Sequence, residues 1–198
     1  MDATGSQRRH EPSVRLLIVP GLHDSGPAHW QSWLESLHRD ALRVRQRDWS
    51  DPDLDRWAAR IAGTLQRDPG ARWIAAAHSF GCLALARLAA LHPELPIEAA
   101  LLVAPADPDR FGVAGLLPQA ALPFGSTLVA SRSDPWLSLA RSQLWSRRWG
   151  SHHVDLGDAG HINAEAGFGP LPLAERWVTT LRARLDRPNH AGRVHAVP

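Results

Sequence analysis

Short apolar runs alternate with longer amphipathic segments along the chain. The short runs are rich in Val, Ile, Leu and Ala, and they predict β-strands at residues 14–19, 42–47, 73–77, 99–104, 127–131 and 153–156. The longer segments carry apolar residues at three- and four-residue spacing, which predicts helices at residues 27–37, 54–65, 80–91, 137–149 and 171–185. This alternation predicts a single-domain α/β fold: a mainly parallel sheet of about six strands with helices on both faces.

The two ends of the chain lack this periodicity. Residues 1–13 and 187–198 are polar or rich in Pro, Gly and His, so we expect flexible tails around a domain at residues 14–186. A chain of 198 residues fits one domain of ordinary size. We therefore expect a single active site, and only residues 106–124 form a connection long enough to act as a flap.

The charges exclude some classes of partner. All 22 basic residues are Arg, and they are interspersed with 20 acidic residues to give a net charge of +2, which argues against a nucleic-acid partner.

Cys82 is the only cysteine, so neither a disulfide nor a zinc cluster is expected. With no signal-peptide pattern and no membrane-spanning run, we expect a cytoplasmic protein without a membrane partner, and no protein partner is indicated.

Candidate chemistry lies just after the predicted strands, where parallel sheets bind their ligands. Ser79 occupies the sequence AHSFG between the strand at 73–77 and the helix at 80–91. This is the position of a nucleophile elbow, a sharp turn that lifts a serine hydroxyl above the sheet. The usual pattern is GxSxG, from which Ala77 departs by one methyl group. The alternative is that Ser79 is an ordinary helix N-cap.

Two later turns supply partners for such a serine. Asp134 follows the strand at 127–131, and His161 lies on a glycine-flanked loop after the strand at 153–156. The chain order Ser, Asp, His is that of α/β-hydrolases, in which the histidine takes the serine proton and the carboxylate orients the imidazole. For Asp134 the alternative is a cap for a helix that begins near Pro135.

The loop at residues 20–26, PGLHDSG, follows the first strand. We expect the backbone N–H groups of Leu22 and Phe80 to form an oxyanion hole. Neither GxGxxG nor a GK[ST] motif is present, which argues against a nucleotide site. The adjacent pair His152 and His153 is insufficient for a metal centre, so no cofactor and no metal are expected.

Several blocks together resemble one family. They are PGLHDSGPAHWQSWLE, RDWSDPDLDRWAARI, HSFGCLALARLA, LLVAPADPDRF, SRSDPW and WGSHHVDLGDAGHINAEAGFGP, and they cover most of the chain. In combination they resemble the retinoblastoma-binding protein nine family of small serine hydrolases, including its bacterial members of the YdeN type. The resemblance implies a compact α/β-hydrolase without a cap, with triad roles on Ser79, Asp134 and His161. The chain departs from the family at Ala77 and in GFGPLPLAERW, where a Trp-Pro pair is usual.

These features predict a serine hydrolase that cleaves a small carboxylic ester or related acyl substrate through an acyl-enzyme intermediate. His23 and Trp136 are the candidate substrate contacts, while most of the nine tryptophans should lie in the core. A different class of function remains open at this point. The fold could serve as a catalytically weak protein-binding module.

Overall fold

The computed structural model describes residues 14–186, so the predicted tails at 1–13 and 187–198 lie outside the described residues. The strands form one six-stranded sheet in the order β2-β1-β3-β4-β5-β6, and every neighbouring pair is parallel. The strands are β1 (Val14–Val19), β2 (Leu42–Arg43), β3 (Arg72–His78), β4 (Ile97–Val103), β5 (Gly125–Ala130) and β6 (His152–Asp155). The helices are α1 (Trp30–Leu37), α2 (Leu54–Leu65), α3 (Phe80–Leu91), α4 (Leu139–Trp149) and α5 (Pro172–Leu185), with one 3₁₀ turn at Ala114–Leu116.

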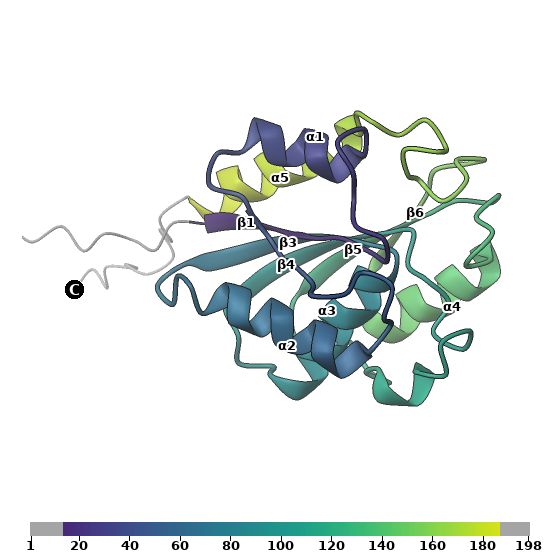
Figure 1. Cartoon of the computed structure of the whole chain (residues 1–198), viewed down its shortest axis with the longest axis horizontal. Helices are drawn as coiled ribbons and strands as arrows, with labels where there is room; N and C mark the ends of the chain where they lie inside the picture. Colours follow the sequence, from purple (N-terminus) through teal and green to yellow (C-terminus); the bar gives the residue numbers. More distant parts are fainter. Residues whose placement is uncertain (1–13, 187–198) are drawn as a thin grey trace, which may run out of the picture.

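Helices cover both faces of this sheet. Figure 1 shows α1 and α5 on one side and α2, α3 and α4 on the other. Alternate strand residues enter separate apolar clusters: Leu17 and Ala75 pack with α2 and α3, whereas Leu16 and Ile74 pack with α1 and α5. The central strands are therefore apolar on both faces, as expected for a buried parallel sheet. The predicted single-domain α/β architecture is confirmed.

Two predicted elements are three or more residues shorter than expected, while the helices expected from 137 and 171 begin at Leu139 and Pro172. The strand at 42–47 is reduced to β2, because its partner β1 is followed by Pro20, which has no N–H to continue the ladder. The helix expected from residue 27 begins at Trp30. His29 is its N-cap, and the imidazole Nδ1 accepts the backbone N–H of Gln31 at 3.1 Å.

The carboxyl ends of β1 and β3 form the topological switch point of the sheet. The chain leaves β1 toward β2 at one edge and leaves β3 toward β4 on the opposite side. Loops that depart in opposite directions leave a crevice between them, which is where open α/β sheets bind ligands. The turn at Ser79 therefore lies at the expected ligand site.

The long connection at residues 106–124 is held against the domain. Its residues Val113, Leu117 and Leu122 are buried in the cluster that contains α3 and α4. Trp149 on α4 donates its Nε1–H to the carbonyl of Pro118 at 3.2 Å. The connection is thus a packed wall rather than a loose flap.

No helix within residues 14–186 combines the length and the apolar character needed to cross a bilayer.

A close approach of two backbone segments places α3 over the end of β1. A Cβ atom added at Gly81 would lie 2.3 Å from the carbonyl oxygen of Pro20 and 2.6 Å from that of Val19. Backbone atoms cannot rotate away as a flexible side chain can. Only glycine, which has no Cβ atom, fits at residue 81. The turn at Ser79 depends on this close approach of α3 to β1.

We expect Gly81→Ala to lower the free energy of unfolding by about 3 kcal/mol or more, because the methyl group forces the helix away from β1. Gly63→Ala is the matched control: Gly63 is also a helical glycine, and its added Cβ meets nothing within 4 Å. This control should stabilise the protein by about 1 kcal/mol. Urea denaturation of both variants measures the difference, and equal effects would contradict the steric explanation.

Candidate active site

Ser79 occupies a strained turn between β3 and α3. Its backbone has φ 53° and ψ −124°, a conformation that residues with a side chain rarely adopt. The backbone N–H of Ser79 donates to the carbonyl of Val103 on β4 at 3.1 Å, which anchors the turn to the sheet. Its hydroxyl makes no capping bond to α3 and lies 2.9 Å from Nε2 of His161. Ser79 thus occupies the N-cap position of α3, but its side chain bonds to His161 instead of capping the helix.

His161 lies between the serine and a buried carboxylate. Its Nδ1 is 3.0 Å from both carboxylate oxygens of Asp134, whose side chain is only 2 % exposed. Since a carboxylate can only accept, Nδ1 carries the hydrogen and Nε2 is left to accept the Ser79 hydroxyl proton. Asp134 does not cap α4, because that helix begins at Leu139 with Ser138 as its N-cap. The structure thus brings together the three residues that the sequence singled out.

The loop that carries His161 is tied to the neighbouring loop after β5. Ser131 Oγ accepts the backbone N–H of Ala159 at 2.9 Å, and Ser133 Oγ accepts that of Gly160 at 3.0 Å. Ile162 has φ 47° with a fully buried side chain, so core packing maintains a backbone conformation unusual for a β-branched residue. These contacts give the imidazole a defined position.

Two further histidines contact His161 in series. The ring centroids of His29 and His78 are 4.7 Å apart, and those of His78 and His161 are 4.8 Å apart. His78 Nε2 donates to the backbone carbonyl of His161 at 3.0 Å. Burial lowers the pKa of His78 well below its ordinary value of 6.5. Burial, followed by the nearby charge of Arg43, lowers the pKa of His29 to about 4, so both rings are neutral at pH 7.

The backbone N–H groups of Leu22 and Phe80 are free to bind a ligand. Phe80 is the first residue of α3, and the first N–H groups of a helix have no intrahelical acceptor. No backbone bond from the Leu22 N–H to another described residue is formed. Both residues lie near Ser79. Phe80 follows it in the chain, and Leu22 follows Gly21, where an added Cβ would be 2.8 Å from the Cβ of Ser79.

A pocket of about 410 Å³ opens beside Ser79. Small-molecule sites commonly have this size. Both candidate substrate contacts line it, and Trp136 is 45 % exposed with its ring centroid 6.2 Å from that of His161. The wall comprises Leu22, His23, Asp24, Gly26, His29, His78, Ser79, Ala106, Phe111, Trp136, His161, Asn163, Ala164 and Glu165.

Other candidate groups do not form a second centre. No set of three or more His, Cys, Asp or Glu side chains within the described part of the chain is placed to share a metal ion. Cys82 is fully buried, and burial raises the pKa of its thiol well above 9.0. A neutral, inaccessible thiol is a poor nucleophile, and Cys82 does not line the pocket.

Both departures from the family pattern lie outside the pocket. Ala77 is a strand residue with no exposed surface, and its methyl group packs in the cluster with α3. In the segment GFGPLPLAERW, Phe168 and Leu171 pack in the cluster with α1 and α5, and the pocket wall ends at Glu165. Neither segment contributes a residue to the pocket wall.

Sequence reasoning missed several residues of this site. His29, His78 and Phe111 line the pocket, although none of them was assigned a role in the site from the sequence. Arg43 bonds to the pocket residue Asp24, and the sequence around it predicts only a strand. That predicted strand also contains Arg45 and Arg47, so no signal in the sequence distinguishes Arg43.

Solved structures similar to this protein share its architecture. A YdeN-like hydrolase from Pectobacterium atrosepticum is 39% identical, with a TM-score of 0.83 over 87% of this chain and 92% of the other. The ydeN gene product of B. subtilis is 18% identical, with a TM-score of 0.71 over 86% and 100%. Est1E from Butyrivibrio proteoclasticus, solved with ferulic acid bound, is 15% identical, with a TM-score of 0.64 over 90% and 92%. The last two show the fold alone.

Comparison with functionally curated proteins finds no match. The sequence profile of the family described as Serine hydrolase matches residues 16–188, which is nearly all of the described domain. Together with the Pectobacterium relative, this match shows that the chain belongs to the serine hydrolase family, in its YdeN-like branch of the α/β-hydrolase fold.

Proposed function

We propose that this hydrolase cleaves a small carboxylic ester or a related acyl substrate through an acyl-enzyme on Ser79. The observation that carries the proposal is the continuous link from Ser79 Oγ to His161 Nε2 at 2.9 Å and from His161 Nδ1 to Asp134 at 3.0 Å. This is the arrangement that activates a serine hydroxyl, which is otherwise a weak nucleophile.

The reaction proceeds in two steps. Ser79 Oγ attacks the acyl carbon while its proton passes to His161 Nε2, and Asp134 stabilises the imidazolium that forms. The N–H groups of Leu22 and Phe80 donate to the oxyanion of the tetrahedral intermediate. His161 then protonates the leaving group as the carbon–oxygen bond breaks. Water, deprotonated by His161, attacks the acyl-enzyme and releases the acid and free Ser79.

The pocket favours small acyl groups without a negative charge. Leu22, Ala106, Phe111 and Trp136 supply apolar surface, and Glu165 is exposed at the edge with no ion-pair partner among the described residues. A carboxylate there repels an anionic substrate. The rim and its limited volume support short neutral esters or thioesters. The cytoplasmic location expected from the sequence stays a prediction.

Labelling by a fluorescent fluorophosphonate tests the proposed nucleophile directly, because the probe phosphonylates only an activated serine. We expect stoichiometric labelling of the wild-type protein and none of Ser79→Ala. His161→Ala should lower the labelling rate by roughly a thousandfold or more. Active-site peptide mass spectrometry and in-gel fluorescence provide the measurements.

Two surface variants serve as controls for that experiment. Ser36→Ala and His92→Ala remove an exposed serine and an exposed histidine away from the pocket, and both should label as the wild-type protein does. A correctly folded wild-type protein that stays unlabelled and inert would overturn the proposal. The alternative of a hydrolase-fold binding module would then take its place.

Acyl preference should depend on Trp136. We expect kcat/KM for p-nitrophenyl esters to be highest from acetyl to hexanoyl and to fall toward dodecanoyl, because the pocket is small. Trp136→Ala should lower kcat/KM for butyryl ester roughly tenfold by removing apolar contact, while longer esters lose less. Trp33→Ala, which changes a tryptophan outside the pocket, is the control. An unchanged chain-length profile in Trp136→Ala would show that this ring does not contact the acyl group.

The neutral histidines set an acid limit on stability. In the unfolded chain an imidazole takes up a proton near pH 6.5, whereas folded His29 does so only at about pH 4. The unfolded state therefore binds more protons between these values, and stability falls as the pH is lowered through this window. His78 acts in the same direction, since its folded pKa is also depressed.

We expect the free energy of unfolding to fall by about 2 kcal/mol from His29 alone between pH 7 and pH 5. His29→Asn keeps a residue type suited to the N-cap and should reduce this acid-dependent loss. His92→Asn, at an exposed site, should leave it unchanged. Urea denaturation across this pH range measures the slope, and an identical slope in wild type and His29→Asn would refute the assignment.

A further inference from the structure

The loop that carries Leu22 has a strained backbone conformation. His23 and Asp24 are consecutive non-glycine residues in the left-handed region, with φ 66° and φ 63°. Each such residue is strained, and strained turns persist only where surrounding contacts over-determine them. The turn's own backbone bond is long, since the Asp24 N–H reaches the Gly21 carbonyl at 3.3 Å. Other groups must therefore stabilise the loop.

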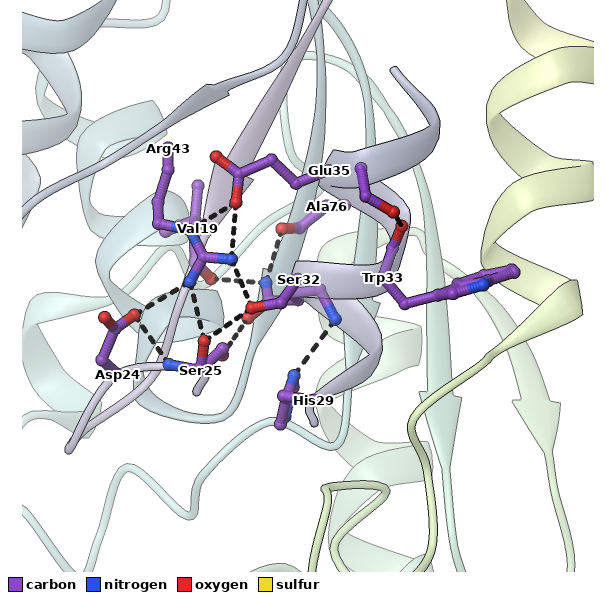
Figure 2. A network of polar contacts seen from close by, with 11 residues as sticks. Val19, Asp24, Ser25, His29, Ser32, Trp33, Glu35, Arg43 and Ala76 are labelled. Carbon is purple, nitrogen blue, oxygen red and sulfur yellow. Dashed lines mark hydrogen bonds and ion pairs between the residues drawn. The ribbon is translucent and has the colours of Figure 1, made fainter. Parts of the chain in front are cut away.

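Arg43 lies directly behind this loop (Figure 2). It comes from the edge strand β2, and its side chain is only 6 % exposed. Nη1 donates to Asp24 Oδ1 and to the carbonyl of Ser25, both at 3.0 Å. On its other side Nε donates to Glu35 at 2.7 Å and Nη2 to Ser32 Oγ at 2.8 Å, both on α1. The planar guanidinium thus connects the loop to α1 with fixed geometry.

Gln31 completes the same network from α1. Its side chain has no exposed surface, and Nε2 donates to the carbonyls of Val19 at 3.0 Å and Ala76 at 2.9 Å. Its Oε1 accepts the Ser25 hydroxyl at 2.5 Å. These carbonyls belong to β1 and β3, so one amide joins the ends of both strands to the loop.

The charge of Arg43 also bears on the reaction. Asp24 lines the pocket, and an unpaired carboxylate there would repel the negative charge that develops on the substrate oxygen. Pairing Asp24 with a buried guanidinium offsets that repulsion. The same residue therefore affects both the direction of the Leu22 N–H and the electrostatic environment of the oxyanion.

We propose that Arg43, supported by Gln31, is a positioning residue that holds the Leu22–Ser25 loop in the conformation required for oxyanion binding. The inference rests on the proposed function, because it assigns Leu22 to the oxyanion hole. Arg43 touches no reacting atom and acts only through the loop. Misplacing a catalytic donor by a fraction of an ångström weakens transition-state binding far more than ground-state binding.

The test compares Arg43→Met and Arg43→Lys with Arg15→Met. Arg15 is a matched control: a partly buried arginine that pairs with Asp68 at 2.8 Å and donates to the Asp40 carbonyl, away from the pocket. Fluorophosphonate labelling is measured at several probe concentrations, which separates the maximal rate from the half-saturating concentration. Circular dichroism and thermal unfolding establish that each variant is folded at the assay temperature.

For Arg43→Met we expect the maximal labelling rate to fall roughly ten- to a hundredfold, below the full loss of one oxyanion donor. The half-saturating concentration should change by less than about threefold, because ground-state contacts remain. The maximal labelling rate of Arg43→Lys should lie between those of wild type and Arg43→Met, since one ammonium cannot bridge the loop and α1 as a guanidinium does. Arg15→Met should lose comparable thermal stability but label at the wild-type rate.

The outcomes separate this inference from the proposed function. If the wild-type protein does not label, the proposed function fails and this inference fails with it. If wild type labels and folded Arg43→Met labels within about twofold of it, the loop needs no such support and only this inference is overturned. Should Arg43→Met fail to fold, Arg43→Lys decides: a rate at least about threefold below wild type supports the inference, and a smaller change overturns it.

Discussion

The close approach between the start of α3 and the end of β1 is the constraint on which the site depends. Because Gly81 has no side chain, the helix can approach the carbonyls of Val19 and Pro20 more closely than a residue with a Cβ atom would allow. The chain can then turn from β3 into α3 within a single residue, Ser79, at positive φ. Ser79 lies in the lining of the pocket, and Phe80 begins α3 directly after it. The proposed nucleophile and one proposed oxyanion donor thus depend on the same steric condition.

Several side chains buried around this turn are hydrogen-bonded to backbone carbonyls of other segments. Gln31 ties β1 to β3, Arg43 ties the loop after β1 to α1, and His78 ties β3 to the carbonyl of His161. Buried polar groups are costly unless paired, so such a network is stable in few arrangements. That property suits a site whose donors and acceptors must keep their geometry while charge develops on a substrate.

The polar site and the apolar core that stabilises the fold lie in different parts of the sheet. Apolar residues fill both faces of the central strands, and the polar side chains of the site gather beyond their carboxyl ends. Changes in the core therefore act mainly on stability, and changes at the strand ends act mainly on chemistry. Ala77 illustrates the point: it departs from the elbow pattern, and its methyl group lies in the core rather than in the pocket.

The sequence by itself determined the α/β architecture, the helices α2 and α3 to the residue, and the candidates Ser79, Asp134 and His161. Periodicity and position after a strand are local signals, and they can be recognised in the linear sequence. Only the tertiary structure decided the roles of His29, His78, Gln31 and Arg43, and the lengths of β2 and α1. These depend on which distant backbone groups need a partner, such as the carbonyls of Val19 and Ala76 that both bind Gln31. No local pattern carries that information, because it arises only when separate segments meet.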